Sequence, residues 1–272
     1  MDIIQRNFFK LLRSGAFNEK ASIEIMSAFK WRRLFQIVQA QNVLNIFVRG
    51  INNHSTDLNL NLPEDLIAEI QQKIDEQKNT TALIDEKNTY LSNKFRNKKF
   101  HKIIHSELHS IDTSVEALDI LKLIVFNTNA MLNSGISLEG VIKLGQYLRT
   151  KGDKVDFLKL EAWLDTLHLQ RMAQLQGSIL MAVFGFEQDE IPFVIKEEKN
   201  AKQLTIKTIS NLVKDNAEEW HFKQGSTGFV YNNNKALRRN LRRSYRYFDY
   251  APLETTSNFI NNFVKGLSEI EE

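Results

Sequence analysis

The sequence contains no cysteine, and this absence removes several kinds of site at once. Without thiols the chain forms no disulfide, no thiolate metal site and no cysteine nucleophile. It also has only three prolines and 11 glycines among 272 residues. Because proline and glycine interrupt regular structure, their scarcity favours long helices over many short strands.

Long hydrophobic runs are missing as well. The longest apolar-rich stretch, LDILKLIVFNTNAML, is interrupted by Lys122, Asn127 and Asn129, and is too short and too polar to cross a bilayer. The opening residues, MDIIQRNFFKLLRSG, have an acid at position 2, two arginines and no apolar run of the length that a secretory signal needs. We therefore expect a cytoplasmic protein without a transmembrane segment.

Motifs that bind phosphates or present nucleophiles are also absent. The sequence has no G-x-x-x-x-G-K-[ST], no G-x-G-x-x-G and no G-x-S-x-G. It has no Asp-x-Asp pair of the kind that holds two Mg²⁺ ions. These absences predict no catalytic residue of a familiar kind and no cofactor.

Helical periodicity dominates what is present, because apolar residues recur three and four positions apart along most of the chain. The predicted helices are 2–14 with a stop at Gly15, 27–50, one or two helices between Pro63 and Ser110, 114–131, a helix ending at Gly152, 156–167, 170–185, 199–221, 234–248 and 256–270. Residues 204–210, LTIKTIS, are the nearest to a strand pattern. We predict an all-α fold, a compact bundle or array of about eight to ten helices. Residues 1–272 would form one domain, with a possible sub-boundary near 194–200 and a basic C-terminal segment, 234–272.

Three of the six histidines lie in KFHKIIHSELHS, residues 99–110. Their four-residue spacing would place His101, His105 and His109 on one face of a helix, where a His-x3-His pair can ligate zinc. A catalytic zinc needs a further ligand from another element, and position 106 is not the Glu of the zincin motif. We expect no metal site and a polar or partly buried helix face, with His105, His109 and Glu107 as weak candidates.

The segment KALRRNLRRSYR, residues 235–246, carries six basic residues and no acid. Such a helix can dock with its basic face in solvent, bind nucleic acid through phosphates and stacked bases, bind an anionic membrane surface, or bind an acidic protein. The candidate anion-binding residues are Arg238, Arg239, Arg242, Arg243, Arg246 and Tyr245. Residues 86–102 are also strongly basic, and we interpret them as the solvated face of a helix.

Two stretches are similar to a known family. FFKLLRSGAF, WRRLFQIVQAQNVLNIFVRGI and LPEDL, in that order, resemble the helical start of a family of uncharacterised bacterial nucleotidyltransferases of the polymerase-beta-like superfamily. A second match begins at SELHS and continues through SGISLEGVIKLGQYLR, VDFLKLEAWLDTL and VFGFEQDEIPF. The order of these motifs agrees over roughly residues 7–70 and 105–193.

The chain departs from the family between these stretches. The resemblance implies a G-S/G-x-D-x-D motif on a strand within an α/β region, whereas residues 75–104 read as a basic helical connection. Glu107 lies near the position where the superfamily often keeps its third carboxylate. One acid without the other two cannot hold two metal ions. The resemblance therefore implies the helical scaffold of such an enzyme without its catalytic part.

Three functions follow as hypotheses. The first is a non-catalytic, degenerate nucleotidyltransferase-like protein that acts by binding a protein partner. The second is a nucleic-acid-binding module that uses the Arg-rich helix 235–246. The third is nucleotide binding or nucleotide transfer at an unrecognised site.

Overall fold

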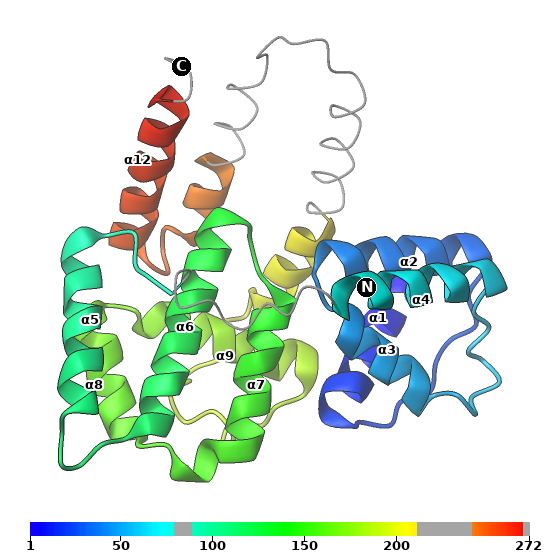
Figure 1. The fold of residues 1–272 in the computed structure, drawn as a ribbon, viewed down its shortest axis with the longest axis horizontal. Helices are drawn as coiled ribbons and strands as arrows, with labels where there is room; N and C mark the ends of the chain where they lie inside the picture. The colour runs from blue at the N-terminus through cyan, green and yellow to red at the C-terminus, as the bar shows by residue number, and fades with distance from the viewer. Residues whose placement is uncertain (79–88, 211–240, 269–272) are drawn as a thin grey trace. The chain divides into compact units, whose positions relative to one another are not determined.

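The computed structural model describes residues 1–78, 89–210 and 241–268 (Figure 1). Within these ranges every regular element is a helix, so the predicted all-α fold is confirmed, and 204–210 is helical. No helix in these ranges is long and apolar enough to cross a bilayer.

The chain divides into two compact units. Unit 1 is Met1–Asp85 with Lys202–Trp220, and unit 2 is Glu86–Ala201 with His221–Glu272. The division after Ala201 follows closely on the predicted sub-boundary near 194–200. The division after Asp85 has no counterpart in the predicted single domain, because the sequence between Pro63 and Ser110 contains neither glycine nor proline to mark it.

The described part of unit 1 contains four helices and a further helical stretch, 201–210, whose first residue belongs to unit 2. The four are α1 (Ile3–Phe17), α2 (Ala28–Ala40), α3 (Leu44–Asn53) and α4 (Glu64–Lys78). A capping box starts α1, in which the Gln5 N–H donates to the Asp2 carboxylate at 2.8 Å and the Asp2 N–H donates to the Gln5 side chain at 3.2 Å. The single helix predicted for 27–50 is wrong, because Asn42 adopts a left-handed conformation (φ 53°) that separates α2 from α3.

The backbones of α1 and α3 cross in close contact at two glycines. A Cβ atom added to Gly15 would lie 1.9 Å from the Ile46 carbonyl oxygen, and one added to Gly50 would lie 2.1 Å from the Leu11 carbonyl oxygen. The predicted helix stop at Gly15 is therefore wrong, because this glycine serves helix packing inside α1. The helix ends at Phe17 and is followed by Asn18, which is left-handed (φ 58°).

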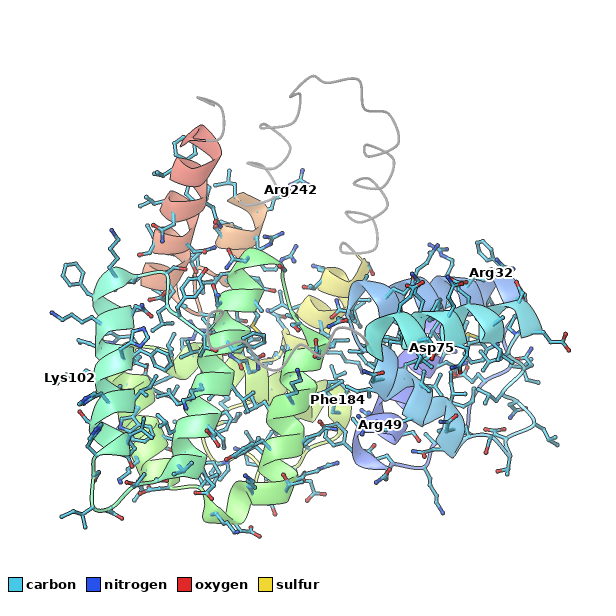
Figure 2. All side chains as sticks on the ribbon, viewed as in Figure 1. Arg32, Arg49, Asp75, Lys102, Phe184 and Arg242 are labelled. Carbon is cyan, nitrogen blue, oxygen red and sulfur yellow. The ribbon has the colours of Figure 1, made fainter. Side chains whose placement is uncertain are left out.

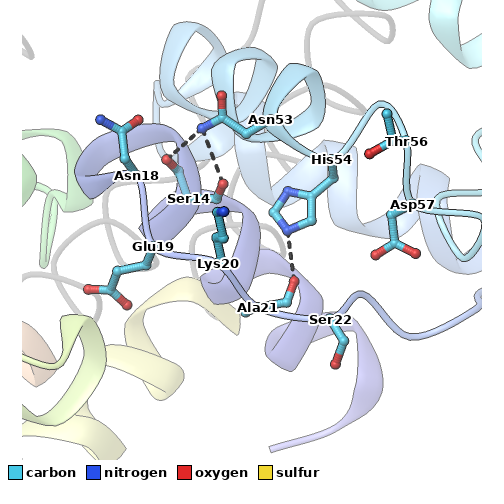
Figure 3. Close-up of a pocket in the computed structure, with 10 residues that line it drawn as sticks. All are labelled: Ser14, Asn18, Glu19, Lys20, Ala21, Ser22, Asn53, His54, Thr56 and Asp57. Atoms are coloured by element: carbon cyan, nitrogen blue, oxygen red, sulfur yellow. Dashed lines mark hydrogen bonds between the residues drawn. The ribbon is translucent and has the colours of Figure 1, made fainter.

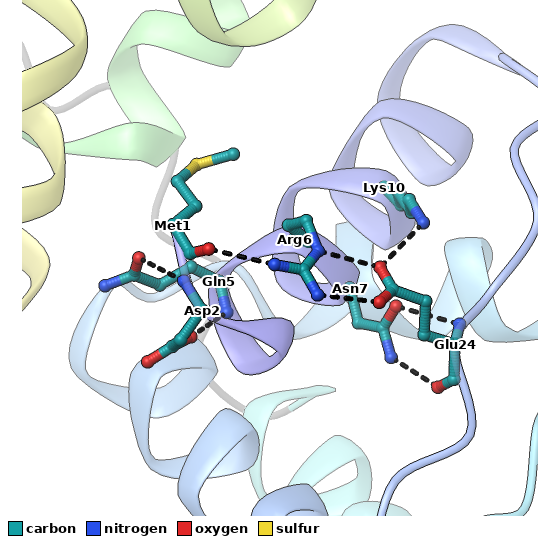
Figure 4. A network of polar contacts seen from close by, with 7 residues as sticks. All are labelled: Met1, Asp2, Gln5, Arg6, Asn7, Lys10 and Glu24. Atoms are coloured by element: carbon teal, nitrogen blue, oxygen red, sulfur yellow. Dashed lines mark hydrogen bonds and ion pairs between the residues drawn. The ribbon is translucent and has the colours of Figure 1, made fainter.

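The chain that enters α2 is held against α1 by a polar network (Figure 4). Glu24 accepts hydrogen bonds from Arg6 Nη2 at 2.8 Å and Lys10 Nζ at 3.1 Å. The buried Asn7 side chain pairs with the backbone of Glu24, at 2.7 Å to its carbonyl oxygen and 3.0 Å from its N–H. The hydrogen bonds from Arg6 and then Lys10 lower the pKa of Glu24 to about 2.

Unit 2 surrounds a central apolar helix. Its elements are α5 (Lys94–Leu108), α6 (Val115–Asn133), α7 (Leu138–Lys151), the 3-10 turn η2 (Gly152–Lys154), α8 (Phe157–Leu167), α9 (Gln170–Phe184), the helical residues 241–247 and α12 (Pro252–Ser268). Residues of α6 are buried on most of its faces, against α5, α7, α8, α9 and α12 (Figure 1). The predicted stop at Gly152 is confirmed.

Candidate functional site

The histidines of α5 face solvent and do not converge with an acid. His105 and His109 stack with ring centroids 4.3 Å apart, and His109 Nδ1 lies 2.7 Å from the His105 carbonyl oxygen. His101 is exposed on the same side, whereas Glu107 is buried on the other. Within residues 1–78, 89–210 and 241–268, no three His, Asp or Glu side chains are placed to hold a metal ion.

Glu107 connects three helices of unit 2. Its carboxylate accepts the Ser114 N–H at 2.6 Å, next to the start of α6, and Lys159 Nζ of α8 at 3.1 Å. The hydrogen bond to Glu107 raises the pKa of Lys159. Glu107 is thus a structural acid at the α5–α6 junction, whereas the resemblance places it near the third carboxylate of a metal site.

The Arg-rich segment is described only in part. Arg238 and Arg239 lie outside the described residues, while Arg242, Arg243, Tyr245 and Arg246 belong to the helical residues 241–247. Arg242, labelled in Figure 2, is exposed and makes no ion pair with another described residue. Tyr245 is 87% exposed. These two side chains are therefore open to a partner.

A polar hollow of about 660 Å³ lies on unit 1 (Figure 3). Its lining residues are Ser14, Asn18, Glu19, Lys20, Ala21, Ser22, Asn53, His54, Thr56 and Asp57. The two ring nitrogens of His54 lie 2.8 Å and 2.7 Å from the carbonyl oxygens of Gly50 and Ala21. The Ser14 hydroxyl accepts from Asn53 Nδ2 at 3.2 Å. His54 therefore has no ring nitrogen left to activate Ser14, and the hollow contains no serine–histidine pair for nucleophilic catalysis.

α12 docks on unit 2 through a polar face. Within residues 252–264 of this helix, the buried residues are Glu254, Thr255 and Asn258. The Asn258 amide donates to the Leu132 carbonyl oxygen at 3.2 Å and accepts from the Ser92 hydroxyl at 3.1 Å. Further hydrogen bonds join Asn93 to Glu254 and Ser257, Asn261 to Ser92, and Asn262 to Asn133. Polar pairing with the residues before α5 and the end of α6 thus holds α12 in place.

The opposite side of α12 is apolar and open to solvent. We call Leu253, Ile260, Phe263 and Val264 the α12 outer face; each of the four is between 45% and 56% exposed. Because an α-helix turns by about 100° per residue, the four side chains lie within one sector, about 100° wide, around the helix axis. This sector is opposite the buried polar residues. A surface helix normally has the reverse arrangement, with its apolar side against the core. The sequence predicts a helix here, and the outward position of its apolar side is known only from the structure.

Exposed apolar side chains continue into the helical residues before α12. Leu241 is 56% exposed and Phe248 is 49% exposed, close in sequence to Tyr245. The Thr255 hydroxyl donates to the Tyr247 carbonyl oxygen at 3.4 Å, which ties this segment to the first turn of α12. The exposed apolar surface of unit 2 therefore includes both consecutive helical segments.

Comparisons with known proteins give no relative from which to infer function. No family model, no curated protein and no solved structure matches this chain. The likeness to a nucleotidyltransferase scaffold rests on the order of sequence motifs and stays a prediction. We therefore derive function from the surfaces of the chain itself.

Proposed function

We propose that this protein acts by binding another protein through the α12 outer face. The observation that carries the proposal is the inverted packing of α12, with polar side chains buried and apolar ones exposed. Contiguous exposed apolar side chains are typical of interaction surfaces. Burial of their exposed halves in a complex contributes about 1 kcal/mol per residue.

The docked orientation of α12 is fixed by its own hydrogen bonds. A half-turn about the helix axis would bury Ile260 and Phe263 but would remove Asn258 from the Ser92 hydroxyl and the Leu132 carbonyl oxygen. Each buried polar group left without a partner costs about 1–3 kcal/mol. The exposed apolar side is therefore a stable property of this docked helix.

The shape and charge of the surface favour one kind of partner. The outer face extends over 12 residues from Leu253 to Val264, about 16 Å along the helix axis, which suits packing against another helix. Arg242, in the helical residues 241–247 that precede α12, is exposed and makes no ion pair with another described residue. We infer that the partner presents an amphipathic helix with an apolar stripe and acidic residues on its flank, because charges at a rim set orientation and specificity.

A scaffold that lacks a catalytic part, as the sequence resemblance implies, would act in this way. The proposal assigns binding to the α12 outer face and gives no catalytic role to Glu107 or to the hollow on unit 1. Glu107 contributes its carboxylate to the junction of α5, α6 and α8.

Site-specific photo-crosslinking in the native cell tests the proposal. A photoreactive phenylalanine analogue replaces Ile260 in one variant and Leu158, which is 82% exposed on α8, in the control. We expect a protein adduct at position 260 that is absent at position 158, with the crosslinked peptide in an acidic, amphipathic helix of the partner. Adducts only with a second copy of this chain, only with lipid, or equally at both positions would overturn the proposal.

A further inference from the structure

The outer side of α5 carries a row of exposed lysines. Lys94, Lys98 and Lys102 follow one another at four-residue spacing and are all exposed; we call them the α5 lysine row. Figure 2 shows Lys102 on the side of α5 away from α6. Lys99 is exposed beside the row. The only acid of α5 is Glu107, which is buried, so no carboxylate on this helix neutralises the row.

Several other cations of the molecule are paired, whereas these lysines have no partner among the described residues. Lys143 pairs with Glu139 at 2.7 Å, and Arg149 pairs with Glu190 at 2.8 Å. The α5 lysine row makes no ion pair or hydrogen bond with another described residue. Successive members are about 6 Å apart along the helix axis, and the row spans about 12 Å. This is a linear array of positive charges available to a linear polyanion.

An exposed aromatic ring lies within the same surface. Phe95 is 82% exposed, whereas eight of the 16 phenylalanines in the described part of the chain are buried. It precedes Lys98 by three positions and Lys99 by four, so the three side chains are neighbours on the helix. A ring next to phosphate-binding cations is the arrangement that stacks an unpaired base.

We propose that the outer side of α5 binds single-stranded nucleic acid. The α5 lysine row contacts successive phosphates without reading sequence, and Phe95 stacks on one base. A duplex keeps its bases stacked inside, whereas a single strand offers a base face to a ring on a convex helix. This site is separate from the α12 outer face and from the Arg-rich segment in which the sequence predicts anion binding.

Binding to labelled oligonucleotides tests the lysine row. The full chain is titrated by fluorescence anisotropy against a dT 20-mer, an rU 20-mer, a DNA hairpin duplex and a poly-glutamate peptide, at several KCl concentrations. Three phosphate contacts contribute about 2 to the slope of log affinity against log salt for a single strand. Replacing the row by glutamine (K94Q/K98Q/K102Q) is expected to remove that part of the slope and to weaken binding roughly tenfold or more.

A matched triple variant separates the row from net charge. Lys154, Lys196 and Lys199 are exposed in the same unit and have no partner among the described residues, so K154Q/K196Q/K199Q removes the same charge elsewhere. We expect this control to bind the single strands with nearly wild-type affinity. An equal loss in the control, equal affinity for poly-glutamate or for the duplex, or no binding at about 50 mM salt would overturn the proposal.

Substitution of Phe95 by leucine tests the stacking contact independently of charge. F95L keeps an exposed apolar side chain but has no ring. We therefore expect its affinity for the single strands to fall by a factor of about five or more, with an unchanged salt slope. Unchanged affinity would overturn the stacking role. The variant I260S/F263S, which alters the α12 outer face, should bind the oligonucleotides like the wild type. The oligonucleotide measurements therefore test nucleic-acid binding at α5 alone. A negative result there would not change the test of protein binding at the α12 outer face.

Discussion

The first and last described helices dock in opposite ways. α1 buries Phe8, Leu11 and Leu12 and brings its backbone against α3 at a glycine, so shape and apolar burial fix its position. α12 buries Glu254 and Asn258 and is positioned by hydrogen bonds. Full burial of an apolar side chain contributes about 1.5–3 kcal/mol, whereas a typical hydrogen bond contributes about 1 kcal/mol net. α12 is therefore positioned by contacts that are individually weaker, and its apolar side stays exposed.

The largest expected effect is at the buried ion pair under α12. Arg96 Nη1 lies 3.8 Å from Glu254 Oε1, and both side chains are buried. Loss of one partner leaves a buried group uncompensated, so Arg96→Met should reduce the free energy of unfolding by about 3–5 kcal/mol. The double variant R96M/E254Q should recover most of that loss in urea denaturation. Equal losses in the single and double variants would show that the pair does not control docking.

Glu254 adds a pH dependence to the same comparison. Burial raises the pKa of the Glu254 carboxyl in the folded chain. The folded state therefore binds a proton more readily than the unfolded state, so the free energy of unfolding rises as pH falls through the folded pKa of Glu254 towards the ordinary value of 4.5. E254Q should lack this contribution. The check is to measure the free energy of unfolding of the wild type and of E254Q over a pH series.

The next effect is at the crossing of α1 and α3. Gly15→Ala places a Cβ where the Ile46 carbonyl oxygen lies 1.9 Å away, so we expect a loss of about 2–3 kcal/mol in unfolding free energy. Gly152 is the control, because its φ is −54° and an added Cβ meets no atom within 4 Å. Gly152→Ala should be neutral or stabilising by up to about 1 kcal/mol. Indistinguishable denaturation curves for the two variants would refute the close crossing.

A smaller effect distinguishes the two sides of α12. Asn258→Ala removes buried hydrogen bonds to Ser92 and Leu132 and should cost about 1–3 kcal/mol. I260S/F263S changes exposed side chains and should alter the unfolding free energy by less than about 0.5 kcal/mol. Thermal and urea unfolding measure the change in stability of each variant. If the serine variant were the less stable one, the apolar side would be part of the core.

The smallest effect concerns the exposed end of α1. The pKa of Glu24 is lowered to about 2 from an ordinary value of 4.5, first by Arg6 and then by Lys10. The stabilisation is present above about pH 4.5 and is lost as pH falls towards 2. Glu24→Gln should show a weaker acid dependence between these values in thermal melts. Parallel curves for the variant and the wild type would contradict this contribution.

Much of the helical architecture follows from the sequence, because periodicity and capping signals are local. Pro63 before α4 and Gly152 after α7 mark observed helix ends. The predictions of a helix stop at Gly15 and of one helix through Asn42 were wrong for a physical reason. A glycine inside a helix and one at its end look alike until the neighbouring helix is known, and a left-handed asparagine has no clear signal within a helical period.

The candidate surfaces are less accessible from sequence, because exposure depends on tertiary docking. The pattern around Ile260 predicts an amphipathic helix, and hydrophobicity alone would place its apolar side inwards. The outward orientation follows from hydrogen bonds between Asn258 and groups more than 100 residues earlier in the chain. The basic character of residues 86–102 is evident in the sequence, but only the structure shows that Lys98 and Lys102 form no ion pair with the other described residues.

The most direct test of the central claim is the affinity of the protein captured through position 260 for three forms of the chain. These are the wild type, I260S/F263S and the control L158S, measured by isothermal calorimetry with purified proteins. Central apolar contacts of an interface are worth about 1–2 kcal/mol or more each, so I260S/F263S should bind roughly tenfold to a hundredfold more weakly. L158S should bind like the wild type. Equal affinity of I260S/F263S and the wild type would contradict the account of α12 as the binding surface.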